Sequence, residues 1–173
     1  CRAADCFVLR TVSKGHYGQF LSGLEAALFE KSGQTVPVFA CGYDWRQDNA
    51  QSAKDVAAFI KKNVKEKYGC TNIYLATHSM GGLVARSMLL QDSEIANMTI
   101  GASHVGQPVD GAAMAWVAIV TGMIEAPLSK MIDGDPCRTG VITSLFQLLP
   151  TDRYFGGPQA WLLRGTTGTP ATQ

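Results

Sequence analysis

The sequence lacks the features that mark membrane-spanning and nucleic-acid-binding chains. Its most apolar uncharged run, residues 111–124, is 14 residues long, which is shorter than the roughly 20 residues that a helix needs to cross a bilayer. The formal net charge is only +1, and no basic run is flanked by aromatic side chains. Because binding to phosphates needs clustered positive charge, we expect no nucleic-acid partner.

Signals for metals and cofactors are also missing. The five cysteines form no C-x-x-C pair and no metal-binding pattern with the three histidines, so we expect neither a metal nor another cofactor. An odd number of cysteines cannot all pair within one chain. One or two disulfides would suit an exported protein, and free thiols would suit a cytosolic one. Extracellular and cytoplasmic locations therefore both stay open.

Strand-like and helix-like segments alternate along the 173 residues, which are enough to bury one core. Helices are indicated by apolar residues at helical spacing, and strands by short β-branched runs. We expect strands at residues 6–12, 36–41, 73–76 and 98–103, a glycine-bearing loop at 13–18, and helices at 20–31, 50–67 and 81–90, the second capped by Asp48 or Asn49. This order predicts an α/β fold, with a mostly parallel sheet flanked by helices.

The most informative segment is residues 72–90, NIYLATHSMGGLVARSMLL. An apolar run leads into a short turn that contains Ser79, and a helix-favouring segment follows at once. This order is typical of a nucleophile elbow, in which a strained turn holds a serine above the end of a central strand. In such a turn the backbone N–H of Met80 donates to the developing oxyanion, aided by the positive end of the helix dipole.

Two details qualify the elbow. Thr77 stands where the usual G-x-S-x-G pattern has its first glycine, whereas Gly81 and Gly82 would let the helix start approach the strand without an intervening Cβ. The alternative is a serine that only caps an ordinary strand–helix turn. The strand–turn–helix context favours the nucleophile.

Three motifs carry a family resemblance. YDWR, from Tyr43 to Arg46, precedes the helix before the elbow; THSMGGLVAR is the elbow; and GASHVGQPVDGA, residues 101–112, follows the next strand. With these motifs at this spacing, the chain resembles α/β-hydrolases, and among them lecithin–cholesterol acyltransferase and its bacterial lipase-like relatives. The LLP at residues 148–150 is a weaker similarity. The resemblance covers residues 20–164.

The resemblance implies an α/β-hydrolase core segment over residues 1–110 and a helical cap- or lid-like segment over residues 111–173. The family's hydrolase domain is longer than this chain. We therefore expect an incomplete sheet, and a catalytic acid and histidine beyond residue 173. The histidines present fit this expectation, because His16 precedes the elbow and His78 should point away from the serine. His104 follows Ser79, but the resemblance places it in a loop that lines the site.

The candidate site-lining residues are His78, His104, Asp44 and Arg46. Asp44 and Arg46 lie on the same side of an extended segment, so a structural pairing with neighbours and direct substrate contact both stay open. The second oxyanion donor comes either from residues 13–18 or from a loop upstream of this chain, as the resemblance implies. Residues 111–124 suit a buried helix or a lid over an acyl pocket, and DGDPC at 133–137 fits a turn.

The activity that follows is hydrolysis of a lipid ester, or transfer of its acyl group, through an acyl-Ser79 intermediate. Water or an alcohol can take the acyl group, and the sequence does not distinguish the two. Two alternatives stay open: a catalytically inactive hydrolase-fold binding module, and a lipase-type toxin or effector domain with the same chemistry. The expected partner is a lipid or ester substrate. Peripheral membrane contact is compatible with this, and no oligomeric state is indicated.

Overall fold

The computed structural model describes residues 14–121, 142–151, 153–154, 163–164 and 169–170. In chain order its elements are α2 (Lys14–Ser32), α3 (Asn49–Phe59), the π-helix η2 (Ile60–Glu66), β1 (Ile73–His78), α4 (Gly81–Gln91), α5 (Ser93–Met98), β2 (Thr99–Val105), α6 (Ala113–Thr121), α8 (Thr143–Phe146), β3 (Leu163–Arg164) and β4 (Thr169–Pro170). The strand predicted at residues 6–12 and the turn predicted at 133–137 lie outside the described residues. Within the described ranges, no helix is long and apolar enough to cross a membrane.

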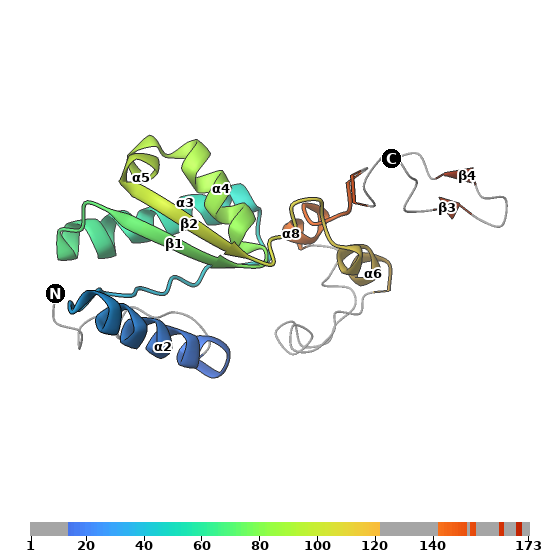
Figure 1. Ribbon diagram of the computed structural model, residues 1–173. Coiled ribbons are helices and arrows are strands. Elements are labelled where there is room, and N and C mark those ends of the chain that lie inside the picture. The colour runs from blue at the N-terminus through green and yellow to red at the C-terminus, as the bar shows by residue number, and fades with distance from the viewer. Residues whose placement is uncertain (1–13, 122–141, 152, 155–162, 165–168, 171–173) are drawn as a thin grey trace.

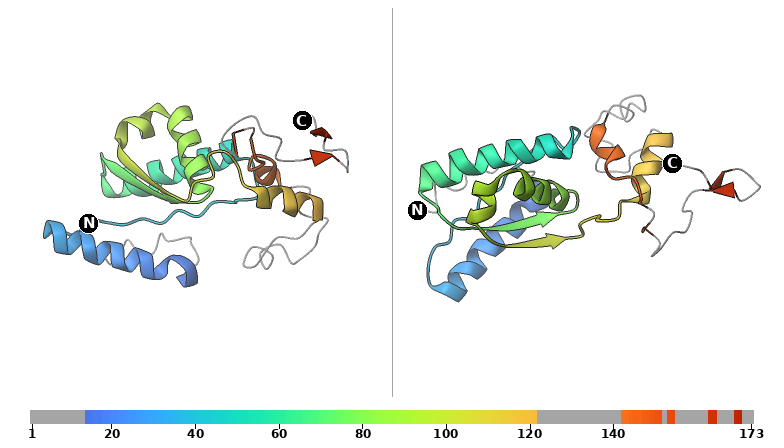
Figure 2. Two further views of the ribbon diagram at one scale, coloured as in Figure 1. Left: turned by 45° about the vertical axis from the view of Figure 1, so that its right-hand side comes forward. Right: turned by 90° about the horizontal axis from the view of Figure 1, so that it is seen from above.

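A parallel pair of strands, β1 and β2, forms the centre of the structure (Figure 1). The register runs from Tyr74 opposite Gly101 to His78 opposite Val105, after an irregularity at the start of β1. α2 lies on one side of the pair, and α3 and α4 lie on the other (Figures 1 and 2). Because the strands are parallel, their carboxyl ends meet at the same edge.

The predicted helices and the elbow strand are present, but two local predictions were wrong. Residues 36–41 form no strand among the described residues. A strand needs a neighbour to complete its hydrogen-bond ladder, and the described residues provide none for this segment. Residues 14–18, predicted within a loop, are the first turn of α2. Glycine lowers helix stability by only about 1 kcal/mol per residue, so the two glycines here do not prevent a helix.

The helix predicted at residues 50–67 changes its winding along its length. Asp48 caps it, since its Oδ1 accepts a hydrogen bond from the N–H of Ala50 at 2.6 Å. α3 ends at Phe59, and the chain continues as the π-helix Ile60–Glu66. π-helical turns are uncommon inside helices, and the sequence pattern does not indicate this one.

Ion pairs fasten η2 to the start of α5. Lys61 Nζ lies 2.7 Å from Asp92 Oδ2 and 2.9 Å from Glu94 Oε2, and Lys65 also pairs with Glu94. The hydrogen bond from Lys61 lowers the pKa of Asp92 below its ordinary value, and hydrogen bonds from Lys65 and Lys61 lower that of Glu94. These groups face solvent, so the pairs contribute orientation more than stability.

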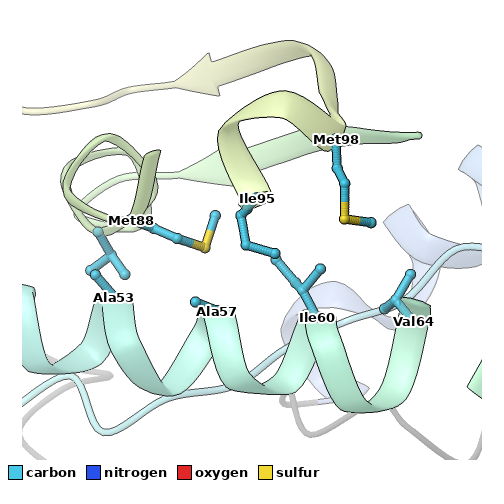
Figure 3. Close-up of a cluster of buried hydrophobic side chains, with 8 residues drawn as sticks. Ala53, Ala57, Ile60, Val64, Met88, Ile95 and Met98 are labelled. Carbon is cyan, nitrogen blue, oxygen red and sulfur yellow. The ribbon is translucent and has the colours of Figure 1, made fainter. Parts of the chain in front are cut away.

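The hydrophobic core lies between α3–η2 and α4–α5 (Figure 3). Met88 and Ile95 are 1% and 0% exposed, and Met88 lies against the small side chains of Ala53 and Ala57. The buried members are Ala53, Ala57, Ile60, Val64, Val84, Met88, Ile95 and Met98, and the β1 side chains Ile73 and Leu75 pack against them. One core therefore holds both the strand and the helix on either side of the elbow.

Ser79 and Met80 connect β1 to α4. Ser79 has a φ of 54°, and no other non-glycine residue among those described has a positive φ. This left-handed region costs a residue with a Cβ about 1–2 kcal/mol. The strained backbone geometry predicted for Ser79 is confirmed.

Replacing a fully buried core side chain should destabilise the protein strongly. Ile95→Ala removes a side chain that is 0% exposed, and we expect the free energy of unfolding to fall by about 3 kcal/mol. Leu90→Ala is the control, because Leu90 on α4 is 88% exposed, and its effect should stay within about 0.5 kcal/mol. Urea unfolding of the full-length protein measures both. Equal losses for the two variants would contradict the assignment of the core.

Relieving the strained turn should have the opposite effect. Ser79→Gly removes the Cβ from a left-handed position, so we expect the free energy of unfolding to rise by about 1 kcal/mol. The reverse change is Gly69→Ala, at a φ of 67° with open space around the new Cβ, which should lower it by a similar amount. The same unfolding measurement checks both changes. A loss of stability in Ser79→Gly would show that the serine side chain, and not the backbone, decides the energetics of the turn.

Candidate active site around Ser79

The Ser79 turn is tied directly to the end of β2. The backbone N–H of Ser79 donates to the carbonyl of Val105 at 2.8 Å, and its own carbonyl accepts from the N–H of Gly82 at 3.1 Å. The first bond continues the parallel pairing one residue beyond β1, and the second begins the helical turn. Ser79 is exposed at this junction. A strained, exposed serine between strand and helix is the backbone arrangement that a nucleophile elbow requires.

Met80 anchors the start of α4. Its side chain is buried, and its carbonyl accepts hydrogen bonds from the N–H groups of Leu83 at 2.9 Å and Val84 at 3.2 Å. The N–H of Met80 makes no hydrogen bond to another described residue. Free N–H groups at a helix start carry partial positive charge, which favours an anion nearby.

The two glycines after Met80 differ in the space around them. A Cβ on Gly82 would lie 2.7 Å from Cγ and Cδ of Gln107, so the Gln107 side chain would have to move to make room for it. Its close neighbour is the loop after β2 and not the strand that the sequence suggested. A Cβ on Gly81 would make only ordinary contacts, the nearest being Tyr43 Oη at 3.7 Å.

His78, the residue before the serine, faces α2. Its Nδ1 lies 3.1 Å from Tyr17 Oη, and the two rings meet edge to face at 6.1 Å. His78 therefore links the first turn of α2 to the elbow. Sequence reasoning missed Tyr17, because no local pattern connects it to a residue 61 positions away.

His104 is held by Thr77 across the two strands. Thr77 and His104 are register partners in β1 and β2, and Thr77 Oγ1 lies 2.6 Å from His104 Nδ1. Thr77, which stands where the usual motif has a glycine, thus holds the His104 ring of β2 through its hydroxyl. Fixing one ring nitrogen orients the other, Nε2. Among the described residues, neither His78 nor His104 forms a hydrogen bond with Ser79. The side chain of His16 lies outside the described residues.

Asp44 and Arg46 pair with each other. Arg46 Nε lies 2.7 Å from Asp44 Oδ1 and Nη2 lies 2.8 Å from Oδ2, a two-pronged contact on the surface. Hydrogen bonds from Arg46 hold the pKa of Asp44 below its ordinary value. Trp45, between them, packs against the apolar cluster formed by Ala118, Ile119, Ile142 and Leu145. Trp45 of YDWR therefore packs against both α6 and the segment that contains α8.

Two further side chains that could attack a substrate, Cys41 and Tyr43, are poor nucleophiles, and Tyr43 lies near the elbow. Burial, and then the charge of Asp55, raise the pKa of the Cys41 thiol to about 11. Burial, with smaller effects of Tyr17 and Cys41, raises the pKa of Tyr43 to about 12. Both groups stay protonated at neutral pH, when a thiolate or phenolate would be needed for attack. Ser79 remains the best-placed nucleophile among these side chains.

The chain after α6 returns to the two loops beside the elbow. The N–H of Ala112 donates to the carbonyl of Leu148 at 2.8 Å, and the N–H of Thr151 donates to the carbonyl of Asp110 at 2.9 Å. The LLP segment therefore pairs with the GASHVGQPVDGA motif.

Within the described residues, no cluster of histidine, cysteine and acidic side chains could hold a metal ion.

α6, inside the run predicted as a buried helix or a lid, has two different faces. Ala115 and Ala118 are buried, whereas Met114, Val117 and Val120 are between 51% and 60% exposed. Of the two buried alanines, Ala118 packs with Ile142 and Leu145 beside Trp45. The helix is therefore half-buried, with an apolar outer face.

Comparisons with known proteins agree with this geometry. The sequence profile of the family described as lecithin:cholesterol acyltransferase matches residues 5–162. No curated protein sequence matches the chain. Among solved structures, the chain is similar to one in "The crystal structure of Tle4-Tli4 complex", with a TM-score of 0.57 and 24% sequence identity. The alignment covers 84% of this chain and 32% of that one, so this chain spans about a third of its structural relative.

The structural likeness shows the fold, and the family profile covers most of the chain. Both agree with the parallel strands and the flanking helices. The chain belongs to the lecithin:cholesterol acyltransferase family and forms part of an α/β-hydrolase fold.

Proposed function

We propose that this protein is a serine-dependent lipid ester hydrolase or acyltransferase that acts through an acyl-Ser79 intermediate. Membership of the lecithin:cholesterol acyltransferase family supports acyl chemistry on lipids in general. The observation that carries the serine assignment is the left-handed φ of 54° at Ser79, in the turn between β1 and α4. Strain of this kind persists at functional turns that the surrounding structure holds in place.

The reaction proceeds in two halves. A general base takes the proton of Ser79 while Oγ attacks the ester carbonyl carbon, and the alcohol leaves after receiving that proton. Water or an acceptor alcohol then attacks the acyl-serine and gives its proton to the base, and the base passes this proton to Ser79 Oγ as the bond to the acyl group breaks and the acid or the new ester leaves. In both halves the N–H of Met80 donates to the oxyanion, helped by the dipole of α4.

The other candidate residues support the site without being the base. His104, oriented by Thr77, lines it with Nε2, and His78 connects it to α2 through Tyr17. The Asp44–Arg46 pair keeps Trp45 in place. The base and the acid that orients it are assigned to residues other than the described ones, because no described carboxylate contacts either histidine.

We also propose the division of the chain into a hydrolase core segment, residues 1–110, and a cap-like segment, residues 111–173. The exposed apolar side chains of Met114, Val117 and Val120 on α6 support contact with a lipid substrate or the surface of a membrane. A catalytically inactive binding module is the alternative that the nucleophile test below would favour.

A toxin or effector role is a second candidate. It rests on the structural relative, which was solved as a complex of two proteins, Tle4 and Tli4. Under this reading the same ester chemistry would be controlled by a protein partner. The chemistry of Ser79 is common to both roles, so the nucleophile test applies to either.

The nucleophile test uses Ser79→Ala in the full-length protein. Loss of Oγ should lower ester hydrolysis by about a million-fold and abolish covalent labelling by a fluorophosphonate probe, while the melting temperature stays close to that of the wild type. The control is Ser87→Ala in α4, where Ser87 Oγ accepts a hydrogen bond from Gln91 at 2.8 Å. This variant should keep activity and labelling. Full activity in Ser79→Ala would end the proposal, and a wild type without activity or labelling would favour the binding module.

A further inference from the structure

Gln147, just after α8, joins parts of the chain that are almost a hundred residues apart. Its Oε1 accepts the N–H of Asn49 at 2.8 Å, and its Nε2 donates to Asp48 Oδ2 at 2.7 Å, across sequence separations of 98 and 99 residues. The other oxygen of Asp48 caps α3 through the N–H of Ala50. The Gln147 amide therefore accepts one backbone N–H at the start of α3, and the cap residue Asp48 accepts the next.

The same segment is attached at a second point, to the loop after β2. The two backbone hydrogen bonds between residues 110–112 and 148–151 flank Gly111, which has a φ of 95°. A Cβ on Gly111 would lie 2.4 Å from the carbonyl oxygen of Leu149, so a side chain there cannot be accommodated without moving the backbone. The close approach of the two segments depends on this glycine.

Residues 142–151 thus bridge two loops, each of which begins just after a residue near the elbow: Tyr43, whose Oη lies 3.7 Å from a Cβ built on Gly81, and Val105, which pairs with Ser79. The first, residues 44–49, receives the Gln147 amide, and its Trp45 packs against Ile142 and Leu145. The second, residues 106–112, begins right after Val105, whose carbonyl accepts the Ser79 N–H. The spacing of the two loops is therefore set by the segment that lies between them.

We propose that Gln147 is a positioning residue, whose amide fixes the spacing of these two loops and so the shape of the ester-binding site beside Ser79. This inference rests on the proposed function. The contact requires a group that donates to a carboxylate and accepts from an N–H at the same time. A neutral amide does both, and so does a protonated carboxyl group, but a carboxylate can only accept.

Charge predicts that the contact between Gln147 and Asp48 is sensitive to substitution. Asp48 is the charged partner of Gln147, whereas the neighbouring Asp44 is already paired with Arg46, and Asp110 lies 3.6 Å from Arg153. A carboxylate at position 147 would meet the Asp48 carboxylate with no described cation in between. Like charges at this distance repel, and one of the pair binds a proton more readily as a result.

The test compares Gln147→Glu with wild type in the full-length protein over pH 5 to 8. At pH 8 we expect kcat/KM for a lipid ester to fall by about fivefold to tenfold, relative to wild type at the same pH. At pH 5 the ratio should return to within about twofold, because the protonated carboxyl group can again donate to Asp48. Gln147→Met, which cannot donate or accept at this position, should lower the ratio equally at every pH.

The matched control is Gln51→Glu. Gln51 is an exposed amide on α3 that donates to Asp55 at 3.0 Å, so the change also places a carboxylate beside an aspartate, but within one helix. The kcat/KM of Gln51→Glu, divided by that of wild type at the same pH, should stay near one throughout the pH range. Hydrogen exchange of peptides that cover residues 44–49 and 106–112 provides a readout besides activity. It should rise in Gln147→Glu at pH 8 and not in Gln51→Glu.

The outcomes distinguish failure of the Gln147 positioning role from failure of the proposed function. If wild type is active and Gln147→Glu matches it at pH 8, or its deficit does not recover at pH 5, the positioning role of Gln147 is wrong. A change confined to the melting temperature, with kcat/KM unchanged, would also overturn it. If wild type shows no Ser79-dependent hydrolysis, the proposed function fails, and the catalytic role of Gln147 fails with it.

Discussion

The strained turn at Ser79 depends on burial of the elements on both of its sides. A left-handed non-glycine residue would relax if either neighbour could shift. β1 cannot, because it pairs with β2 and places Ile73 and Leu75 against the core. α4 cannot either, because Val84 and Met88 are enclosed by α3, η2 and α5. The buried apolar contact between these helices therefore supports the backbone geometry at Ser79.

Polar side chains at the carboxyl edge organise the surroundings of the turn. Thr77 holds His104 across the strands, and Tyr17 holds His78 from α2. In each pair a hydroxyl meets Nδ1, and no carboxylate among the described residues contacts either ring as the acid of a catalytic histidine would. The two histidines next to Ser79 thus contribute position and hydrogen-bonding capacity. The proposed chemistry therefore assigns the proton transfer to groups other than these two rings.

Two of the motifs that suggested the family, YDWR and GASHVGQPVDGA, have a structural purpose in this chain. YDWR places Trp45 in an apolar cluster, the loop after β2 approaches residues 148–151 through Gly111, and Gln147 connects the bridge back to the start of α3. None of these contacts involves the reacting atoms. Under the proposed function they would position the loops near Ser79, which makes them candidates for selectivity among ester substrates.

The sequence by itself determined the strand–turn–helix at Ser79, the cap at Asp48 and the buried stripe of α3. These features depend on signals within a few residues: an apolar run before two glycines, a capping carboxylate and apolar residues at helical spacing. The tertiary structure alone decided the partners of His78, His104, Asp44 and Gln147. The Thr77–His104 pair requires a register between strands that begins with an irregularity, and the Asp48–Gln147 contact closes a loop of almost a hundred residues. The absence of a strand at residues 36–41 has the same origin. A ladder needs a neighbouring chain, and contacts between distant segments are formed by packing, which no local pattern records.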